Sequence, residues 1–372
     1  MSTIRWTEEH TDRSARRHSE SGAPQPIRIV VVDDRIKADT AYELAADGAT
    51  LLWRGDFHNG RQLLSALRRR VDRRSKQRAG GAFQQHRRLR GDRARILGRL
   101  VVLLDEDYAL ELRRAPDVRQ ACREAYGPPS GRRTVSLTEL LGVLGAHQWR
   151  MRGVEVPALG ARIHPHYGVF SPVRGEYVEL VARAPLPEAS DGLPRTAFDL
   201  GTGTGVLAAV LARRGFDRII ATDNSSRALA CARDNIDRLG LADRVEITGP
   251  TLYPEGRAHL VVCNPPWLPE RPTSILERGV YDENGEMLDG FLAGLTDHLA
   301  AGGEGWLILS DLAEHLGLRA PGELPDRIAA AGLRVVDRLE IRPRHRRPRN
   351  AADPLHRARI AEITSLWRLR PG

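Results

Sequence analysis

The sequence predicts an α/β protein: a seven-stranded, mostly parallel sheet covered by helices, with an additional N-terminal α+β domain. Three observations support this prediction. The chain has 372 residues, more than one domain usually holds. Its second half alternates short apolar strands with helices, which is typical of a parallel sheet with helices on both faces. A glycine-rich turn follows the first of those strands.

The predicted strands are short apolar runs bounded by turn residues. They lie at 197–200, 219–222, 245–248, 260–263, 306–310, 333–341 and 360–369. The predicted helices between them lie at 206–213, 227–239, 287–300 and 325–331. The last two strands form a hairpin-like pair, so we expect one mixed edge of the sheet.

Four segments are predicted along the chain. Residues 1–25 are polar and lack periodicity, which predicts a disordered lead. Residues 26–152 form a basic N-terminal domain that recognises the substrate. Residues 153–182 form an inter-domain hairpin and linker helix, and residues 183–372 form the catalytic domain.

The N-terminal domain contains two clear helix signals. Leu63, Leu64, Leu67 and Val71 lie on one face of a predicted helix whose other face is Arg-rich. Ser136, three residues before Glu139, forms a capping box for a helix that runs to residue 149.

Positive charge is concentrated in this domain. The chain has a net charge of +9, and residues 61–99 hold thirteen Arg and one Lys against Asp72 and Asp92. A second basic stretch covers residues 342–349. Two interpretations remain open: a nucleic-acid partner, or solvated helices in a chain that uses Arg for almost every cation.

Other site classes find little support in the sequence. No apolar run approaches the ~18 residues that a membrane span needs, and no signal pattern begins the chain, which predicts a cytoplasmic protein without a membrane partner. The three cysteines, Cys122, Cys231 and Cys263, are far apart, which suggests neither disulfides nor a zinc site. We expect no metal, and we interpret His164 and His166 as surface or hinge residues.

Two motifs carry the chemistry. Residues 198–205 read Phe-Asp-Leu-Gly-Thr-Gly-Thr-Gly, and residues 261–267 read Val-Val-Cys-Asn-Pro-Pro-Trp. Glycines allow a ligand to approach the backbone, and the helix after them directs free N–H groups into the crevice. Asp223, at the end of the next strand, is positioned to hold ribose hydroxyls. A dinucleotide site would share these features, but it would have GxGxxG and would not be expected to carry the second motif.

The second motif suits a planar nitrogen acceptor. Asn264 Oδ1 and the Pro265 carbonyl can accept its two N–H bonds, and consecutive prolines hold these acceptors in place. Trp267 offers a flat face for stacking the planar group of a substrate.

On these motifs the chain resembles the class I S-adenosylmethionine methyltransferases, which have a Rossmann-like fold, and within them the Asn-Pro-Pro-aromatic group. The resemblance implies S-adenosylmethionine as cofactor. It implies that the methionine end lies along Asp199, Gly201, Gly203 and Gly205, the ribose at Asp223 and the adenine at Asn224, with Asn264 also near the cofactor. The family often has an acid after the third strand, and here Thr251 or a backbone carbonyl must replace it.

The linker resembles that of the release-factor glutamine methyltransferases. The match covers residues 156–160 and 167–181 and implies that Phe170, Pro172 and Glu176 line the substrate pocket with Pro266. A Val between Pro172 and Arg174 departs from that family's pattern.

The substrate remains open among three classes. The linker and the Asn-Pro-Pro loop favour protein glutamine, the Arg concentration favours an amino group of an RNA or DNA base, and an extra private domain also suits a small-molecule amine or amide. A protein that only binds RNA and is catalytically silent is a fourth interpretation, and the two intact motifs argue against it.

Overall fold

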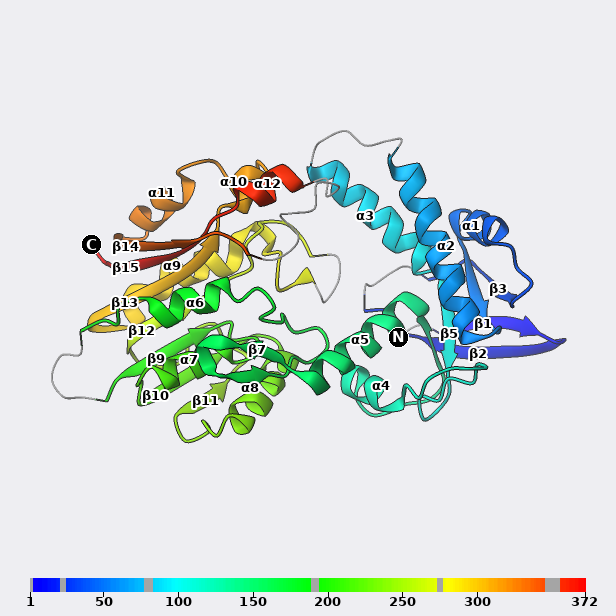
Figure 1. Cartoon of the computed structure of the whole chain (residues 1–372), viewed down its shortest axis with the longest axis horizontal. Helices are drawn as coiled ribbons and strands as arrows, with labels where there is room; N and C mark the ends of the chain where they lie inside the picture. The colour runs from blue at the N-terminus through cyan, green and yellow to red at the C-terminus, as the bar shows by residue number, and fades with distance from the viewer. Residues whose placement is uncertain (1–2, 21–24, 77–82, 189–193, 273–276, 345–354) are drawn as a thin grey trace. The chain divides into compact units, whose positions relative to one another are not determined.

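The computed structural model describes residues 3–20, 25–76, 83–188, 194–272, 277–344 and 355–372. The chain forms two compact units, Met1–Gln148 and Trp149–Gly372 (Figure 1). The boundary falls inside helix α5 (Leu137–Arg152), slightly before the predicted domain end at residue 152. The predicted hairpin and linker helix therefore belong to the second unit.

The first unit has a mixed six-stranded sheet in the order β1-β2-β6-β5-β4-β3. Its strands are β1 (Thr3–Glu8), β2 (Thr11–Arg17), β3 (Arg28–Val32), β4 (Ala49–Trp53), β5 (Leu100–Leu104) and β6 (Arg133–Ser136). Its other helices are α1 (Ala38–Ala46), α2 (Phe57–Lys76), α3 (Phe83–Leu97) and α4 (Arg119–Tyr126). Strands β3, β4 and β5 are parallel neighbours.

The prediction of a disordered lead over residues 1–25 is wrong for its strand-forming part. Strands β1 and β2 form an antiparallel hairpin, and β2 continues the sheet by pairing with β6. Ile4, Trp6 and Ala15 are buried on one face of this hairpin. The signal was missed because the alternating apolar positions are few and separated by charged residues.

Both helix signals of the N-terminal domain are confirmed. Leu63, Leu64, Leu67 and Val71 are buried in α2. The Glu139 backbone N–H donates to Ser136 Oγ at 3.0 Å, which caps the start of α5.

The second unit contains the predicted seven-stranded sheet, in the order β11-β10-β9-β12-β13-β15-β14. Its strands are β9 (Thr196–Leu200), β10 (Arg218–Thr222), β11 (Val245–Thr248), β12 (Ala258–Cys263), β13 (Leu299–Ser310), β14 (Leu333–Ile341) and β15 (Thr364–Pro371). Strands β9 to β13 run parallel, whereas β15 is antiparallel to both β13 and β14. The mixed edge is therefore confirmed.

Helices cover both faces of this sheet (Figure 1). One apolar core lies beneath α6 (Glu176–Arg183), α7 (Val206–Arg213) and α8 (Ser226–Arg238). The opposite core lies beneath α9 (Glu286–His298) and α11 (Glu323–Ala330). The unit also includes the small hairpin of β7 (Val154–Val156) and β8 (Ala161–Ile163), and the short helices α10 (Leu312–His315) and α12 (His356–Ala361).

Candidate functional site

The three predicted site loops leave neighbouring strands at one edge of the sheet. Strand β9 lies between β10 and β12, and Leu200 is paired in register with both Thr222 and Cys263. Gly201, Asp223 and Asn264 each directly follow one of these paired residues. Because parallel neighbours are about 4.8 Å apart, the three loops start at one level and close together.

The turn after β9 exposes its backbone. Gly201 and Gly203 have φ values of 69° and 57°, in the left-handed region that side chains disfavour. A Cβ added at Gly203 would meet nothing nearer than the Gly201 carbonyl oxygen at 4.0 Å, whereas one at Gly201 would meet the Met287 methyl at 2.3 Å. Open space for a ligand therefore lies at Gly203. Gly205 precedes α7, again with positive φ.

Two acids accept hydrogen bonds from this turn and from the helix that follows it. Asp199 is buried, and its Oδ2 accepts from Thr202 Oγ1 at 2.6 Å and from the Ala208 N–H at 3.0 Å. Asp223 accepts from the Gly203 N–H at 3.0 Å and from the Ser225 N–H at 2.8 Å. Both carboxylates thus determine the shape of the glycine turn, a role that the sequence analysis did not assign to them.

The electrostatics of this pair favour a cation. Burial, with a smaller contribution from repulsion by Asp223, raises the pKa of Asp199 to about 6. Burial also raises the pKa of Asp223. Neither carboxylate forms an ion pair with another of the residues that the structure describes. A positively charged ligand would relieve the cost of ionising both.

The segment after β11 is held against the end of β10. Thr222 Oγ1 donates to the Leu252 carbonyl at 2.6 Å, and Thr251 Oγ1 donates to the Tyr253 carbonyl at 2.8 Å. Thr251 is half-buried and Asn224 is exposed. The Thr251 hydroxyl hydrogen is therefore used locally, which leaves its oxygen as an acceptor.

The loop after β12 contains a contact that the sequence did not predict. Trp267 Nε1 donates to Asn264 Oδ1 at 2.9 Å. Pro265 is buried, while Asn264, Pro266 and Trp267 are half-buried. The indole N–H fixes which side of the carboxamide carries oxygen, and a carbonyl oxygen keeps a second lone pair for another donor.

A second segment, residues 280–282, pairs with this loop through backbone hydrogen bonds. The Leu268 N–H donates to the Val280 carbonyl at 3.1 Å, and the Asp282 N–H donates to the Leu268 carbonyl at 2.9 Å. Asp282 then accepts from the Met287 N–H at 3.0 Å, capping the start of α9. The sequence pattern did not identify Asp282 as the anchor of this segment.

The predicted linker residues differ in their environments. Phe170 is 37% exposed and packs against Gly279, just before the segment that pairs with Leu268. Pro172 is buried. Glu176 is also buried and accepts from the Arg344 N–H at 2.6 Å, so this carboxylate already has a structural partner.

Glu362 is a residue that the sequence analysis missed. Its carboxylate is fully buried, accepts from Ser310 Oγ at 2.9 Å and lies 3.5 Å from Arg174 of the linker. Burial raises the pKa of this carboxyl. The sequence signal for this residue was an acid within the predicted strand 360–369. These contacts join the linker to the end of β13 and to the segment just before β15.

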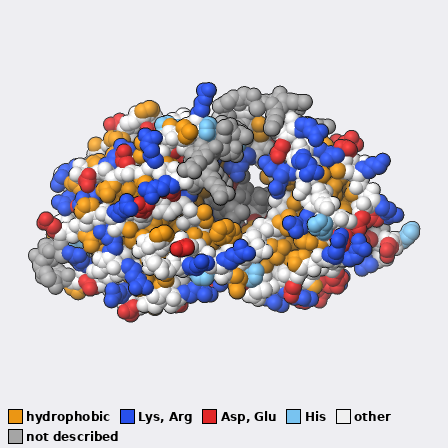
Figure 2. All heavy atoms as spheres, viewed as in Figure 1, with side chains coloured by type: hydrophobic (Ala, Val, Ile, Leu, Met, Phe, Trp, Pro, Cys, Tyr) orange, Lys and Arg blue, Asp and Glu red, His pale blue; other side chains and the backbone are white. Residues whose placement is uncertain are grey.

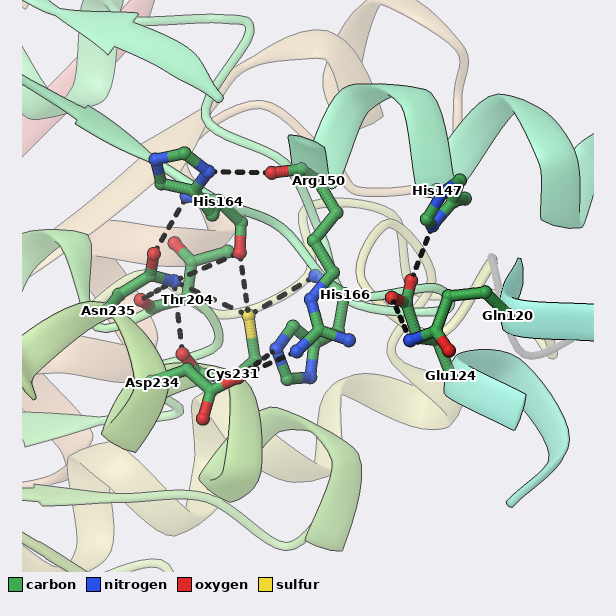
Figure 3. Close-up of polar contacts among 10 residues, drawn as sticks. All are labelled: Gln120, Glu124, His147, Arg150, His164, His166, Thr204, Cys231, Asp234 and Asn235. Atoms are coloured by element: carbon green, nitrogen blue, oxygen red, sulfur yellow. Dashed lines mark hydrogen bonds and ion pairs between the residues drawn. The ribbon is translucent and has the colours of Figure 1, made fainter. Parts of the chain in front are cut away.

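The hairpin histidines are not free surface residues (Figure 3). Asn235 Oδ1 accepts from the His164 N–H at 2.7 Å, and Asn235 Nδ2 donates to the Thr204 carbonyl of the glycine turn at 3.1 Å. His166 Nε2 lies 2.9 Å from Asp234 Oδ2, which also accepts from Arg150 at 2.8 Å. The hairpin is thereby joined to α8 and to the glycine turn.

Two kinds of feature are absent from the described ranges. No helix there is long and apolar enough to cross a membrane. The same ranges contain no group of three or more His, Cys, Asp or Glu side chains suited to a metal ion.

Comparison with known proteins gives a consistent result. Residues 160–314 match the family model described as "Methyltransferase small domain". A ribosomal protein L11 methyltransferase of Vibrio vulnificus (strain CMCP6) is 34% identical over 101 residues, 27% of this chain and 34% of that protein. A release factor glutamine methyltransferase of Cereibacter sphaeroides is 34% identical over 154 residues, 35% of this chain and 55% of that protein. The chain thus spans between about a third and about half of the length of these relatives.

Two solved structures that align with part of this chain are described by their titles as a methylase and a methyltransferase. The ribosomal protein L11 methylase from Lactobacillus delbrueckii subsp. bulgaricus is 17% identical with a TM-score of 0.36, covering 55% of this chain and 81% of that chain. A geranyl diphosphate methyltransferase in complex with SAM is 12% identical with a TM-score of 0.39, covering 53% and 84%.

The matched range contains the glycine turn, Asp223 and the Asn264 loop, all at one edge of the seven-stranded sheet. Residues 160–314, within the second unit, are therefore similar to the methyltransferase small domain, and the curated relatives named above are methyltransferases.

Proposed function

We propose that this protein transfers a methyl group from S-adenosylmethionine to a planar amide nitrogen, with the side chain of a protein glutamine as substrate. One observation carries the proposal. Asn264 and the glycine turn leave adjacent strands at the same level, because Cys263 and Leu200 are paired in register. An acceptor nitrogen held at Asn264 would therefore lie within reach of a ligand bound over the turn.

The residues at the glycine turn fit the cofactor. The methionine portion would lie along Asp199, Gly201 and Gly203, where the backbone is open at Gly203 and two acids lack a cation among the described residues. When bound, the cofactor supplies an electrophilic methyl group on a positively charged sulfur.

The remaining cofactor contacts follow the same edge. Asp223 would hold the ribose hydroxyls, and Asn224 would lie beside the adenine. The Thr251 oxygen, whose hydrogen already bonds to Tyr253, would accept from the adenine amino group. Gly205 would start the helix whose N-terminus faces the ligand.

The Asn264 loop would orient the nucleophile. The free lone pair of Asn264 Oδ1 and the Pro265 carbonyl accept the two N–H bonds of the substrate amide. This arrangement favours sp3 character at nitrogen as positive charge develops, and the two acceptors are held before the substrate arrives. The Trp267 N–H prevents the Asn264 carboxamide from rotating. Phe170, Pro172, Glu176 and Pro266 would form the surrounding wall.

The glutamine assignment is supported by the relatives. One is named as a release factor glutamine methyltransferase, and several others as ribosomal protein L11 methyltransferases. A second candidate, an amino group of a nucleic-acid base, is favoured by the Arg-rich helices α2 and α3. The base edge would present the same two N–H bonds to Asn264.

Methyl labelling distinguishes these candidates. The protein is incubated with S-adenosylmethionine carrying a labelled methyl group and a lysate separated into protein, RNA, DNA and small-molecule fractions. We expect label in protein, recovered after digestion as N5-methylglutamine. Label confined to RNA or DNA would select the second candidate. Binding of the cofactor without label in any fraction would contradict methyl transfer itself.

A further inference from the structure

The catalytic account leaves the Arg-rich segment without a role. The described parts of α2 and α3, residues 57–73 and 83–97, contain ten Arg and two Asp. Arg61, Arg68, Arg69, Arg73 and Arg88 are all exposed. We call the surface that these five arginines form the α2–α3 face.

The location of this charge is not explained by a general preference for Arg. Residues 61–99 carry fourteen cations against two acids, a formal charge of +12, whereas the whole chain carries +9. The rest of the protein is therefore net acidic. A preference for Arg determines which cation is used, but it does not gather the cations on two helices.

The fold holds these side chains at the surface. Leu63, Leu64, Leu67 and Val71 are buried, which turns the opposite side of α2 to solvent. Arg61 and Arg68 are seven residues apart, so they lie two turns apart on the same side of the helix. Figure 2 shows basic side chains over the part of the surface where α2 and α3 lie in Figure 1.

The two helices form one surface. They pack against each other, and Arg93 of α3 pairs with Asp72 of α2 at 3.2 Å. The other acids near the face are also used: Asp39 pairs with Arg70 at 2.6 Å, and Asp92 pairs with Arg95 at 3.2 Å. These three acids thus neutralise three arginines outside the five.

Four arginines of the face remain uncompensated. Arg61, Arg68, Arg69 and Arg88 form no ion pair with any residue in the part of the chain that the structure describes. Surfaces that only need solubility usually intersperse both signs of charge, because like charges repel. A concentrated, uncompensated positive face is instead the electrostatic footprint of a polyanion site.

The geometry favours a duplex over an unpaired strand. Unpaired nucleic acid is bound largely by stacking bases on aromatic side chains. The two aromatic residues of these helices, Phe57 and Phe83, are both buried. Helix α2, with 20 residues, is about 30 Å long, which is close to one turn of a nucleic-acid duplex.

We propose that the α2–α3 face binds the phosphate backbone of a nucleic-acid duplex and so docks the protein on a nucleic-acid-containing partner. Arg side chains donate to phosphate oxygens and position the protein without reading the base sequence. The proposal goes beyond the methyl-transfer function and does not depend on which nitrogen is methylated.

The test measures binding by fluorescence anisotropy, without cofactor, at several salt concentrations. The probes are a 20-base-pair RNA duplex, a DNA duplex of the same sequence, the unpaired strand and a poly-glutamate peptide. With four uncompensated arginines in contact, log Kd against log salt should change with a slope of magnitude about 4. The RNA and DNA arms identify which duplex is preferred.

Matched variants locate the site. The triple variant Arg68→Gln, Arg69→Gln, Arg88→Gln should reduce the slope by about 3 and weaken duplex binding by 10-fold or more. The control, Arg213→Gln, Arg238→Gln, Arg334→Gln, removes the same charge from exposed positions of the second unit and should leave binding unchanged. Unaltered melting temperatures establish that both variants fold.

Four outcomes would overturn the proposal: no duplex binding, an equal loss in the control variant, tighter binding of the unpaired strand, or preference for the acidic peptide. The last would instead identify an acidic protein surface as partner. Because no methyl transfer is measured, this result is independent of the labelling experiment.

Discussion

The two units place acids in similar positions and use them differently. In the first unit, Asp56 and Asp105 follow the parallel strands β4 and β5. Asp56 pairs with Arg113 and Arg114 at 3.0 and 2.7 Å, and Asp105 pairs with Arg132 at 2.6 Å. In the second unit, Asp199 and Asp223 have no such cation among the described residues.

The backbone beside these acids differs in the same sense. A Cβ added at Gly55, after β4, would meet Trp53 at 2.5 Å and Asp34 at 2.6 Å, so this turn is filled. At Gly203 the same atom would find open space to 4.0 Å. The comparison teaches that an acid at the end of a parallel strand indicates a ligand site only where its charge is uncompensated and its turn is open.

The largest effect is expected at Asn264, in the loop after β12 of the second unit. Asn264→Ala should lower kcat by about 100-fold or more, because it removes a preorganised acceptor. The Kd for S-adenosylmethionine, measured by calorimetry, should stay unchanged. The control variant Asp105→Asn changes an acid that follows β5 of the first unit and is paired with Arg132, so it should leave kcat unaltered. Full activity of the Asn264 variant would contradict the proposed orientation of the nucleophile.

The uncompensated acid gives the second prediction. The pKa of Asp199 is raised from 3.8 to about 6, so its contribution to stability is complete below pH 3.8 and is lost as the pH rises through 6. Without cofactor, Asp199→Asn should therefore be more stable at pH 7, by up to about 3 kcal/mol. Urea unfolding at several pH values measures this difference.

The same variant should bind S-adenosylmethionine at least 10-fold more weakly, because the cationic ligand loses a carboxylate. Equal affinity would show that the buried acid only shapes the turn. For the unaltered protein, cofactor affinity should fall as the pH drops through 6, where Asp199 gains its proton.

The indole contact predicts a smaller effect. Trp267→Phe keeps an aromatic ring but removes the N–H that holds Asn264 Oδ1. We expect kcat to fall about 10-fold, the equivalent of one hydrogen bond. A fall as large as that of Asn264→Ala would indicate that stacking, rather than orientation of the carboxamide, is the main role of Trp267.

The smallest effect on activity is expected at Asp56. The hydrogen bond from Arg114 is the main cause that holds the pKa of this carboxyl below its usual range. Its contribution to stability is present above pH 3.8 and is lost as the pH falls, the opposite sign to Asp199. Asp56→Asn should lower the melting temperature at pH 7 and leave kcat unchanged. A change in kcat would contradict the contrast between the paired acids of the first unit and the unpaired acids of the second.

Patterns that repeat along the chain were predictable. The seven strands of the second unit follow from apolar runs between turn residues, and the mixed edge follows from its last two strands. The glycine turn and the Asn264 loop are local motifs, so their positions after β9 and β12 could also be read from the sequence.

Contacts between distant residues were not predictable. The β1–β2 hairpin is stabilised by burial of Ile4 and Trp6, which local polarity conceals. Glu362 meets Ser310 and Arg174 only after the sheet is assembled. The bond between Trp267 and Asn264 spans three residues, yet it depends on side-chain rotamers that a residue pattern does not specify.

The carboxamide of Asn235 has a consequence for how variants of this protein will behave. Its Oδ1 accepts from the backbone N–H of His164, beside the hairpin, and its Nδ2 donates to the Thr204 carbonyl of the glycine turn. The hairpin and the glycine turn are therefore coupled through one side chain. Substitutions in the hairpin are therefore expected to weaken ligand affinity in a mutational scan, at positions that do not contact the ligand.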